Sequence, residues 1–205
     1  MILIGYSGHA YVAAGILKAI GKPAIAYCDN EEKKNNPFKL IYLGKETDHK
    51  VIEKIKQTDF FIAVGDNSIR KKIYDQLSLL SNYPINIIHP SAIIDDSSII
   101  EKYGVMMSTR VCINPLVKIG KGVICNTGCI IEHECNVEAF AHIGPGAILC
   151  GNVTVGKGSF VGAGAIIKQG ISIGENTIIG AGAVVVKNVG NNVIEVGNPS
   201  RKLVK

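Results

Sequence analysis

The second half of the chain carries an apolar residue at every sixth position, and this period constrains the fold more than any other feature. The series runs through Met107, Ile113, Ile119, Cys125, Ile131, Val137, Ile143, Leu149, Val155, Val161, Ile167, Ile173, Ile179 and Val185. A helix repeats at about 3.6 residues and a strand at about 2, so neither explains the period. A β-solenoid does, because three hexapeptides form one triangular coil of about 18 residues with large aliphatic side chains pointing inward.

The neighbours of this series support the same prediction. The residue two places earlier is small or branched, as in Val105, Val111, Val117, Val123, Cys129, Cys135, Ala141 and Ala147. The residue that follows is often glycine, which would ease the corner between two faces: Gly120, Gly144, Gly156, Gly162, Gly174 and Gly180. The pattern extends back in weaker form through Ile87, Ile93 and Ile99. We therefore expect coils that begin near His89 and end near Asn188, and we assign residues 87–205 to this domain and its tail.

The first half of the chain, residues 1–86, follows a different pattern. Apolar runs predict buried strands at residues 1–5, 24–28 and 59–65. Apolar periodicity predicts helices over residues 10–20 and 68–80. Strands that alternate with helices form a parallel sheet, so a small Rossmann-like α/β domain is expected before the solenoid.

A short turn in this first domain is a candidate phosphate site. The segment from Gly5 to His9 joins a strand to the start of a helix, whose free N–H groups and positive end favour phosphate. Asp29 follows the second strand and stands about 20 residues further on, where a carboxylate would accept from a ribose hydroxyl. The spacing G-x-G-x-x-G is not met, so a tight turn without a ligand is the alternative.

A basic helix is a second candidate in the first domain. The helix that follows Asp66 and Asn67 carries Arg70, Lys71 and Lys72. These cations would either face a nucleotide or form a solvated surface.

Composition excludes several classes of protein. With 47% hydrophobic and 19% charged residues, the chain is that of an ordinary globular protein. It has no apolar run of membrane-spanning length and no signal-peptide core after its first residues, so we expect a cytoplasmic protein without membrane insertion. Six cysteines form no C-x-x-C pair, which favours reduced, buried thiols. The net charge of +5 is spread along the chain without a basic run, which argues against nucleic acid as a partner.

Four segments resemble one family of enzymes. They are 5-GYSGHA-10, 28-CDN-30, 60-FFIAVGDNSIRKKIY-74 and 126-NTGCIIEHEC-135. Together with the hexapeptide period, they are similar to the bacterial hexapeptide-repeat sugar acetyltransferases. The most similar group is the UDP-4-amino-sugar N-acetyltransferases of bacillosamine biosynthesis, with the perosamine N-acetyltransferases and sialic acid O-acetyltransferases as relatives. The resemblance covers nearly the whole chain.

The resemblance implies a fold and an assembly. The solenoid would be a left-handed parallel β-helix, three chains would associate, and acetyl-CoA would lie in the cleft between two neighbouring chains. The α/β domain would bind a nucleotide-linked amino sugar through Ser7, Gly8, His9, Asp29, Asn30, Gly65 and Asn67. The bacillosamine enzyme has two adjacent acidic residues where this chain has Asp29 and Asn30, which leaves the sugar nucleotide open.

The same resemblance assigns the catalytic groups. His133 would be the general base that removes a proton from the attacking nitrogen, since imidazole is the side chain type best suited to proton transfer near neutral pH. Glu134 would orient the ring and stabilise the imidazolium, although adjacent Glu132 is an alternative. The cofactor would be bound by His142 at its acetyl group, by the backbone N–H of Gly151 at the oxyanion, and by Ala163 and Ala181 along its length.

The spacing of the two histidines adds a condition. His133 and His142 are nine residues apart, which is half of a coil, so they cannot share a face of one solenoid. A cleft between two chains would collect both.

The sequence therefore predicts an acetyl-CoA-dependent N-acetyltransferase of a nucleotide-linked amino sugar, without a metal, that serves cell-surface glycan or glycoprotein biosynthesis. Acetylation of a hydroxyl, as on sialic acid, remains open because the same histidine and glutamate would activate either nucleophile. Two alternatives come from other classes. One is a zinc hydratase of the γ-carbonic anhydrase type, for which the solenoid offers only His133 and His142, with His89 at its edge. The other is a non-catalytic nucleotide-binding or structural solenoid.

Overall fold

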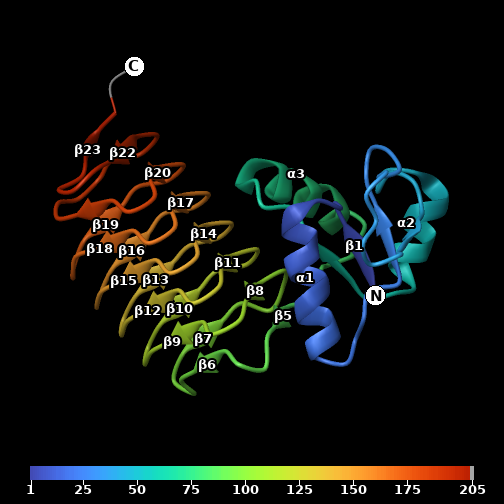
Figure 1. The fold of residues 1–205 in the computed structure, drawn as a ribbon, viewed down its shortest axis with the longest axis horizontal. Helices are drawn as coiled ribbons and strands as arrows, with labels where there is room; N and C mark the ends of the chain where they lie inside the picture. The colour runs from blue at the N-terminus through green and yellow to red at the C-terminus, as the bar shows by residue number, and fades with distance from the viewer. Residues whose placement is uncertain (204–205) are drawn as a thin grey trace.

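The computed structural model describes residues 1–203 and shows two domains in series (Figure 1). The first contains a four-stranded parallel sheet with the order β3-β2-β1-β4. Its elements in chain order are β1 (Ile2–Ile4), α1 (Gly8–Ala19), β2 (Ala26–Cys28), β3 (Ile41–Tyr42), α2 (His49–Lys56), β4 (Phe60–Ile62) and α3 (Asn67–Ser78). The three strands and two helices expected from the sequence are present.

Two elements of this domain were not anticipated. Strand β3 has two residues, and its Ile41 is exposed, so it lacks a buried apolar run. Helix α2 has eight residues, of which only Val51 and Ile55 are buried. Strand β3 is too short to show a pattern, whereas Val51 and Ile55 have the spacing of one helix face, a signal that the prediction did not use.

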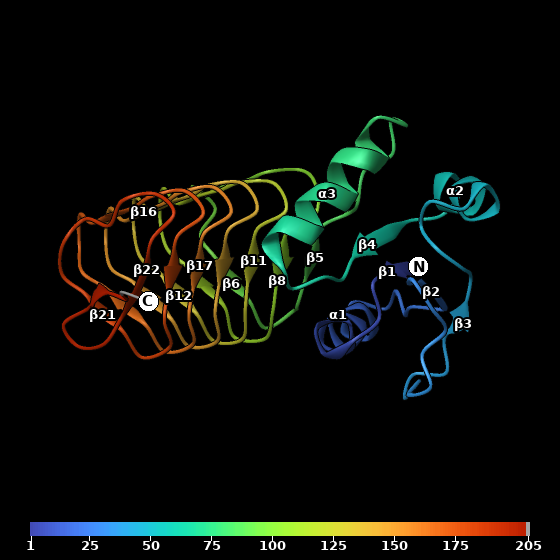
Figure 2. The same ribbon diagram turned by 90° about the horizontal axis from the view of Figure 1, so that it is seen from above.

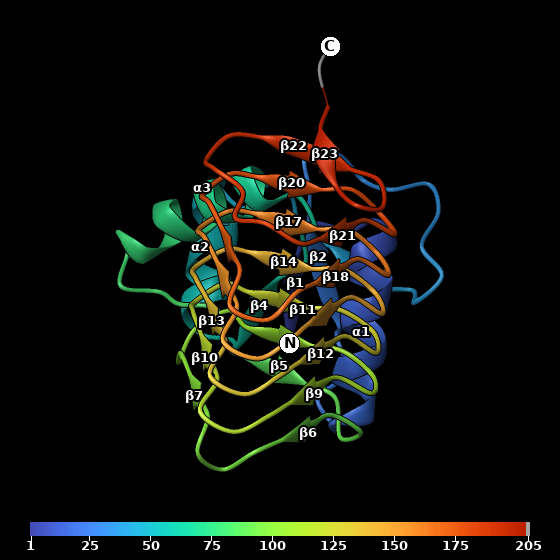
Figure 3. The same cartoon turned by 90° about the vertical axis from the view of Figure 1, so that its left-hand side faces the viewer.

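The second domain is a left-handed parallel β-helix, as predicted, whose two- and three-residue strands stack into three sheets (Figure 3). The first sheet contains β5 (Ile87–Ile88), β8 (Met106–Met107), β11 (Ile124–Cys125), β14 (His142–Ile143), β17 (Phe160–Val161), β20 (Ile178–Ile179) and β22 (Ile194–Val196). The second contains β6 (Ile93–Ile94), β9 (Cys112–Ile113), β12 (Ile130–Ile131), β15 (Ile148–Leu149), β18 (Ile166–Ile167) and β21 (Val184–Val185). The third contains β7 (Ile99–Ile100), β10 (Lys118–Ile119), β13 (Asn136–Val137), β16 (Thr154–Val155) and β19 (Ser172–Ile173).

The six-residue series fills the interior of this β-helix. Every member of the series from Met107 to Val185 is at most 2% exposed, and all belong to one continuous apolar core. The small or branched residues two places earlier, from Val105 to Ala147, are also buried in that core. Each strand pairs with the strand one coil away, as Lys118 does with Asn136. The predicted inward register is confirmed.

The corner glycines have a packing role rather than a conformational one. A Cβ on Gly144 would lie 2.6 Å from the carbonyl oxygen of Val161 on the next coil, and one on Gly162 would lie 2.5 Å from the backbone nitrogen of Ala181. Neither glycine has a positive φ. The left-handed conformation falls instead on another position of the repeat, occupied for example by Glu134 (φ 60°) and Gly146 (φ 63°). At Gly144 and Gly162, glycine therefore follows the inward residue because the adjacent coil lies too close for a side chain.

The coils extend further than expected at the C-terminal end. The expected end near Asn188 is too early, because Val189 bridges to Ile173 and β22 pairs with β20. Strand β23 (Arg201–Lys202) then folds back antiparallel on β22. The last two residues of the expected tail, 204–205, lie outside the described residues. No helix in residues 1–203 is long and apolar enough to cross a membrane.

Two helices join the domains. Helix α1 packs against β5, and its Ala10 and Leu17 share an apolar cluster with Met106 and Ile124 on the outer side of the first sheet. Helix α3 runs beside the β-helix on the other side of this contact (Figure 2). The α/β domain therefore covers the early coils of the first sheet and leaves its later coils open.

Arg70 of α3 is buried in this junction with 1% exposure. Its Nε donates to the carbonyl of Gly122 and its Nη2 to the carbonyl of Phe140, both on the β-helix, at 2.9 Å each. Nη1 donates to the carbonyls of Val64 and Gly65 at 3.1 and 3.0 Å. Arg70 is thus neither a nucleotide ligand nor part of a solvated face, which corrects both readings of the basic helix for this residue.

We predict that Gly144→Ala destabilises the protein by about 1–3 kcal/mol, because the new methyl group would force two coils apart. Gly190→Ala is the matched control, since a Cβ there meets nothing within 4 Å and its φ is not positive. The control should change stability by no more than about 0.5 kcal/mol. Urea unfolding measures both, and equal midpoints for the two variants would contradict the packing role.

Candidate functional site

His133 and Glu134 form a side-chain pair at the corner between β12 and β13. The Nδ1 of His133 lies 3.0 Å from the Oε2 of Glu134, and both side chains are about half exposed. Because a carboxylate only accepts hydrogen bonds, Nδ1 carries a proton, and in the neutral ring Nε2 then presents its lone pair. The ring is therefore oriented as a proton acceptor, and the carboxylate that orients it belongs to Glu134.

Gly151 lies one coil further, directly against the ring of His133. A Cβ on Gly151 would lie 2.4 Å from the Cε1 and 2.5 Å from the Nε2 of that ring, so no side chain fits there. Gly151 is buried, and its N–H donates to no acceptor within residues 1–203. An unpaired backbone N–H beside the basic nitrogen is a donor available to a developing oxyanion.

His142 points from β14 toward the α/β domain and is 6% exposed. Its Nδ1 lies 3.3 Å from the carbonyl oxygen of Gly65, and its Nε2 lies 3.2 Å from the Nδ2 of Asn126. Burial, followed by the charge of Arg70, lowers the pKa of His142 to about 3. One chain does not bring His142 and His133 together, because the first lies on a face of the β-helix and the second at a corner beyond the next face.

The α/β domain holds a cavity of about 630 Å³ at the carboxyl ends of β1, β2 and β4. It gathers Ser7, Asp29, Asn30 and Gly65 of the expected substrate residues. Lys45 and Lys72 also line it, together with Glu46 and Asp66. Lys72 belongs to the basic helix that the sequence offered as a nucleotide contact, whereas Lys45 was not anticipated. A cavity with lysines at this edge of a parallel sheet suits a phosphate-bearing ligand.

The beginning of α1 adjoins this cavity. Ser7 is the N-cap, but its side chain makes no capping hydrogen bond, and the first turn has no acidic residue. The N–H groups of Gly8 and His9 are therefore not used by the cap. The ring of His9 is turned into the protein, where its Nε2 is buried without a hydrogen-bond partner among residues 1–203, and burial lowers its pKa to about 4.

Asp29 has several protein partners in this structure. Its Oδ2 accepts from the N–H of Tyr6 at 2.9 Å, and its Oδ1 accepts from the N–H of Asn30 at 2.7 Å. Lys33 forms an ion pair with Oδ1 at 3.1 Å. Asp29 thus links the ends of β1 and β2. A ribose hydroxyl that donated to Asp29 would share a carboxylate oxygen that already accepts a hydrogen bond from the protein.

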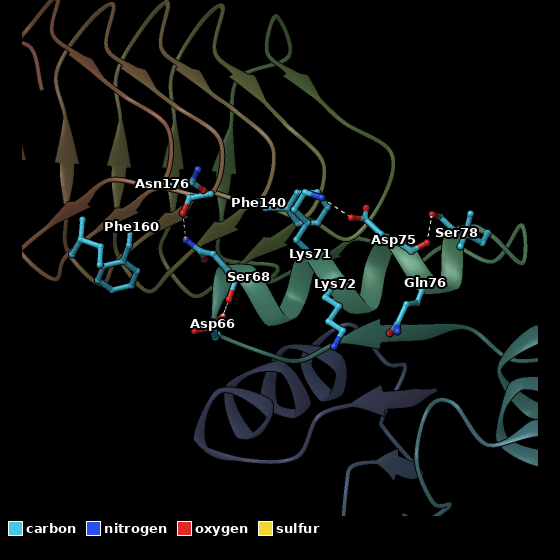
Figure 4. A pocket seen from close by; sticks show the side chains of 15 residues that line it. Asp66, Ser68, Lys71, Lys72, Asp75, Gln76, Ser78, Phe140, Phe160 and Asn176 are labelled. Atoms are coloured by element: carbon cyan, nitrogen blue, oxygen red, sulfur yellow. Dashed lines mark hydrogen bonds and ion pairs between the residues drawn. The ribbon is translucent and has the colours of Figure 1, made fainter. Parts of the chain in front are cut away.

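A larger cavity of about 1030 Å³ lies between α3 and the open part of the first β-helix sheet (Figure 4). Phe140, Phe160 and Asn176 reach it from the β-helix, while Lys71 and Asp75 stand on α3. The two cavities share Gly65, Asp66, Lys72 and Gln76, so they are neighbours on either side of the start of α3. Phe140, Phe160 and Ile178 form an apolar wall of this cavity, which was not predicted. A signal was present in the sequence, because Phe160 and Ile178 occupy outward positions of the β-helix, where a solvated face would carry polar residues.

Asn67 lines the larger cavity, but its side chain is committed to the protein. Its Nδ2 donates to the carbonyls of Gly158 and Ser159 at 2.9 and 3.1 Å, and its Oδ1 accepts from Arg70 at 2.8 Å. In this structure Asn67 connects the domains, and its role in substrate binding remains a prediction.

Ala163 and Ala181 occupy exposed corners of two successive coils, between the first and second sheets. The corner with His133 and Gly151 lies between the second and third sheets. The two sets of expected cofactor residues therefore flank opposite edges of the second sheet. In the part of the chain that the structure describes, no three His, Cys, Asp or Glu side chains converge to hold a metal ion.

Sequence families match both domains. The family model described as the PglD N-terminal domain matches residues 1–77, and that of the bacterial transferase hexapeptide (six repeats) matches residues 134–169 and 152–187. The UDP-N-acetylbacillosamine N-acetyltransferase of Bacillus subtilis (strain 168) is 33% identical over 108 residues. That match spans 52% of this chain and only 50% of the relative.

Solved structures match over almost the full length. A histidine variant of the GDP-perosamine N-acetyl transferase from Caulobacter crescentus, in complex with CoA and GDP-perosamine, has a TM-score of 0.92 and 31% identity. The match covers 100% of this chain and 96% of that one. The acetyltransferase domain of PglB from Neisseria gonorrhoeae FA1090, in complex with acetyl coenzyme A, has a TM-score of 0.91 and 31% identity, with 98% of each chain covered. The chain belongs to the family of hexapeptide-repeat sugar N-acetyltransferases with a PglD-type N-terminal domain.

Proposed function

We propose that this protein transfers the acetyl group of acetyl-CoA to the amine of a nucleotide-linked amino sugar, such as a UDP-4-amino-4,6-dideoxy sugar, for cell-surface glycan or glycoprotein biosynthesis. The observation that carries the proposal is the His133–Glu134 pair beside the unpaired N–H of Gly151. These groups supply a base, an orienting carboxylate and an oxyanion donor at one corner. Relatives named as N-acetyltransferases of UDP-N-acetylbacillosamine and GDP-perosamine support the acceptor class.

The geometry supports an order of steps. The amine nitrogen attacks the thioester carbon as the Nε2 of His133 takes a proton from it, and Glu134 stabilises the imidazolium. The N–H of Gly151 donates to the oxyanion of the tetrahedral intermediate. The intermediate then loses the thiolate, which takes the proton from His133, so the products are an acetamido sugar and CoA.

The two connected cavities support a nucleotide-linked acceptor. The nucleotide would lie in the cavity of the α/β domain, with its phosphates near the first N–H groups of α1 and near Lys45 and Lys72. The proposed substrate-binding residues are Ser7, Gly8, His9, Asp29, Asn30, Gly65 and Asn67. The sugar would then pass Gly65 toward the larger cavity, and His142, Gly151, Ala163 and Ala181 would bind acetyl-CoA.

A substrate panel tests the function. We expect CoA release with UDP- or GDP-linked amino sugars and at least about 10²-fold lower kcat/KM with the free amino sugars, because binding energy from the nucleotide is used in the transition state. Equal turnover of free and nucleotide-linked sugars would contradict the nucleotide part of the proposal. Turnover of sialic acid alone would favour the O-acetyltransferase alternative, and no turnover with any acceptor would favour a non-catalytic solenoid.

We also infer a homotrimer that works in the cytoplasm. The outward side chains of the second sheet form an apolar ladder of Ile93, Cys112, Ile130, Ile148, Ile166 and Val184. The outward positions of the third sheet are mostly polar, with Lys118, Asn136, Thr154 and Ser172. Three copies packed on their apolar ladders would close a symmetric ring. Each cleft would then join the His133 corner of one copy to the Ala163 corner and the His142 face of the next.

Ile148→Asp tests this assembly. The substitution places a charge in the middle of the apolar ladder, so we expect light scattering to show monomers and the rate of acetyl transfer to fall at least about 10²-fold. Thr154→Asp, at the equivalent outward position of the polar sheet, is the matched control and should remain a trimer. An Ile148→Asp trimer, or a wild-type monomer with full activity, would contradict the assembly.

Single substitutions separate the two histidines. We expect His133→Ala to lower kcat by about 10²-fold or more with little change in the KM for acetyl-CoA, as loss of a general base does. His142→Ala should raise the KM for acetyl-CoA more than it lowers kcat. The pair Glu134→Gln and Glu132→Gln is the control for the orienting carboxylate, and only the first should lower kcat. The reverse pattern in either pair would show that the roles are wrongly assigned.

A further inference from the structure

The two ring nitrogens of His142 have partners of opposite hydrogen-bonding character. Nδ1 faces the carbonyl oxygen of Gly65 at 3.3 Å, and a carbonyl only accepts. Nε2 faces the Nδ2 of Asn126 at 3.2 Å, and an amide NH₂ only donates. Both contacts are satisfied together by one state alone, the neutral imidazole with its proton on Nδ1.

The carbonyl of Gly65 is itself held in place. Arg70 donates from Nη1 to Gly65 at 3.0 Å and to the preceding Val64 at 3.1 Å. The same guanidinium is fixed to the β-helix through the carbonyls of Gly122 and Phe140. The planar guanidinium thus sets the direction of the Gly65 carbonyl relative to β14, where His142 lies.

The second partner of His142 is also held in place. The Oδ1 of Asn126 accepts from the backbone N–H of Thr127 at 2.8 Å. This bond assigns the oxygen to the Thr127 side of the amide and leaves the NH₂ group to face His142. The orientation of Asn126 therefore follows from the local hydrogen bonds.

We propose that Arg70 and Asn126 are positioning residues that hold His142 as a neutral imidazole protonated on Nδ1, with Arg70 acting through the carbonyl of Gly65. The relevance to acetyl transfer rests on the proposed function, in which His142 contacts acetyl-CoA. In this state His142 gives its N–H to Gly65 and its Nε2 lone pair to Asn126, so it would contact acetyl-CoA as an uncharged ring and leave proton transfer to His133. The nearby guanidinium and the ring of His9, 5.9 Å away between centroids, both oppose a charged His142.

The proposal is tested first without turnover, by ¹⁵N NMR of the histidine ring nitrogens in the full chain. We expect wild-type His142 to show one tautomer, protonated on Nδ1. Arg70→Lys keeps the charge but cannot make five hydrogen bonds, and it should give a mixture of tautomers. Asn126→Ala removes the other partner on the half-buried surface of the β-helix, and it should also give a mixture even where Arg70→Lys fails to fold.

Leu77→Ala is the matched control, because Leu77 is buried in the same helix and lines neither cavity. This variant loses stability, by about 2–5 kcal/mol, without touching Gly65. It should leave the His142 tautomer unchanged. A single Nδ1-protonated tautomer in Asn126→Ala and in folded Arg70→Lys, or a mixture in Leu77→Ala, would overturn the proposal.

Kinetics then connect the tautomer to the reaction. We expect Asn126→Ala and Arg70→Lys to raise the KM for acetyl-CoA by about threefold or more and to change kcat less, while Leu77→Ala changes neither. A larger fall in kcat than rise in KM would overturn the assigned role of His142 in cofactor binding. The NMR experiment does not depend on turnover. If the proposed function proves wrong, the tautomer of His142 in the variants still decides whether Arg70 and Asn126 are positioning residues.

Discussion

The buried guanidinium of Arg70 is the contact on which the arrangement of the two domains depends. Its five hydrogen bonds end on neutral oxygens, four carbonyls and the amide of Asn67, from both domains. Burial lowers the pKa of Arg70 to about 9, so the group remains charged at neutral pH. A buried charge that loses an acceptor is costly, and the domains therefore have few alternative positions. This fixed junction makes the two cavities neighbours that share a wall.

The β-helix determines where chemistry can occur. On its faces, the backbone groups are used by strands of adjacent coils, and the inward side chains fill the core. At the corners, side chains such as those of His133 and Glu134 project outward, and the N–H of Gly151 makes no hydrogen bond within residues 1–203. Residues at equivalent corners of successive coils lie in contact, which is why Gly151 meets the ring of His133 although 18 residues separate them. The period that builds the fold thus also builds the site.

The features of the fold that follow from the six-residue period could be predicted from the sequence. The features that depend on contacts between the two domains could not. The inward series and the contact of successive coils come from a local rule repeated along the chain. The sequence grouped Arg70 with the adjacent lysines as a surface cation, because nothing in its local sequence shows that its guanidinium donates to carbonyls of the β-helix. The same limit applies to the apolar wall around Phe160 and to the burial of His142. Strand β3 gave no signal because it has only two residues, whereas α2 carries Val51 and Ile55 at helical spacing, a signal that the prediction did not use.

The separation of the two histidines has a consequence for the whole assembly. Within one chain, His133 lies at one edge of the apolar second sheet, and the face of His142 adjoins the other edge. No rearrangement inside a stacked coil can close that separation, because the coil is fixed by parallel pairing above and below. If both act on one thioester, they belong to different copies of the chain. The apolar ladder that lies between them is then the surface that assembles the site, and loss of oligomerisation becomes equivalent to loss of the active site.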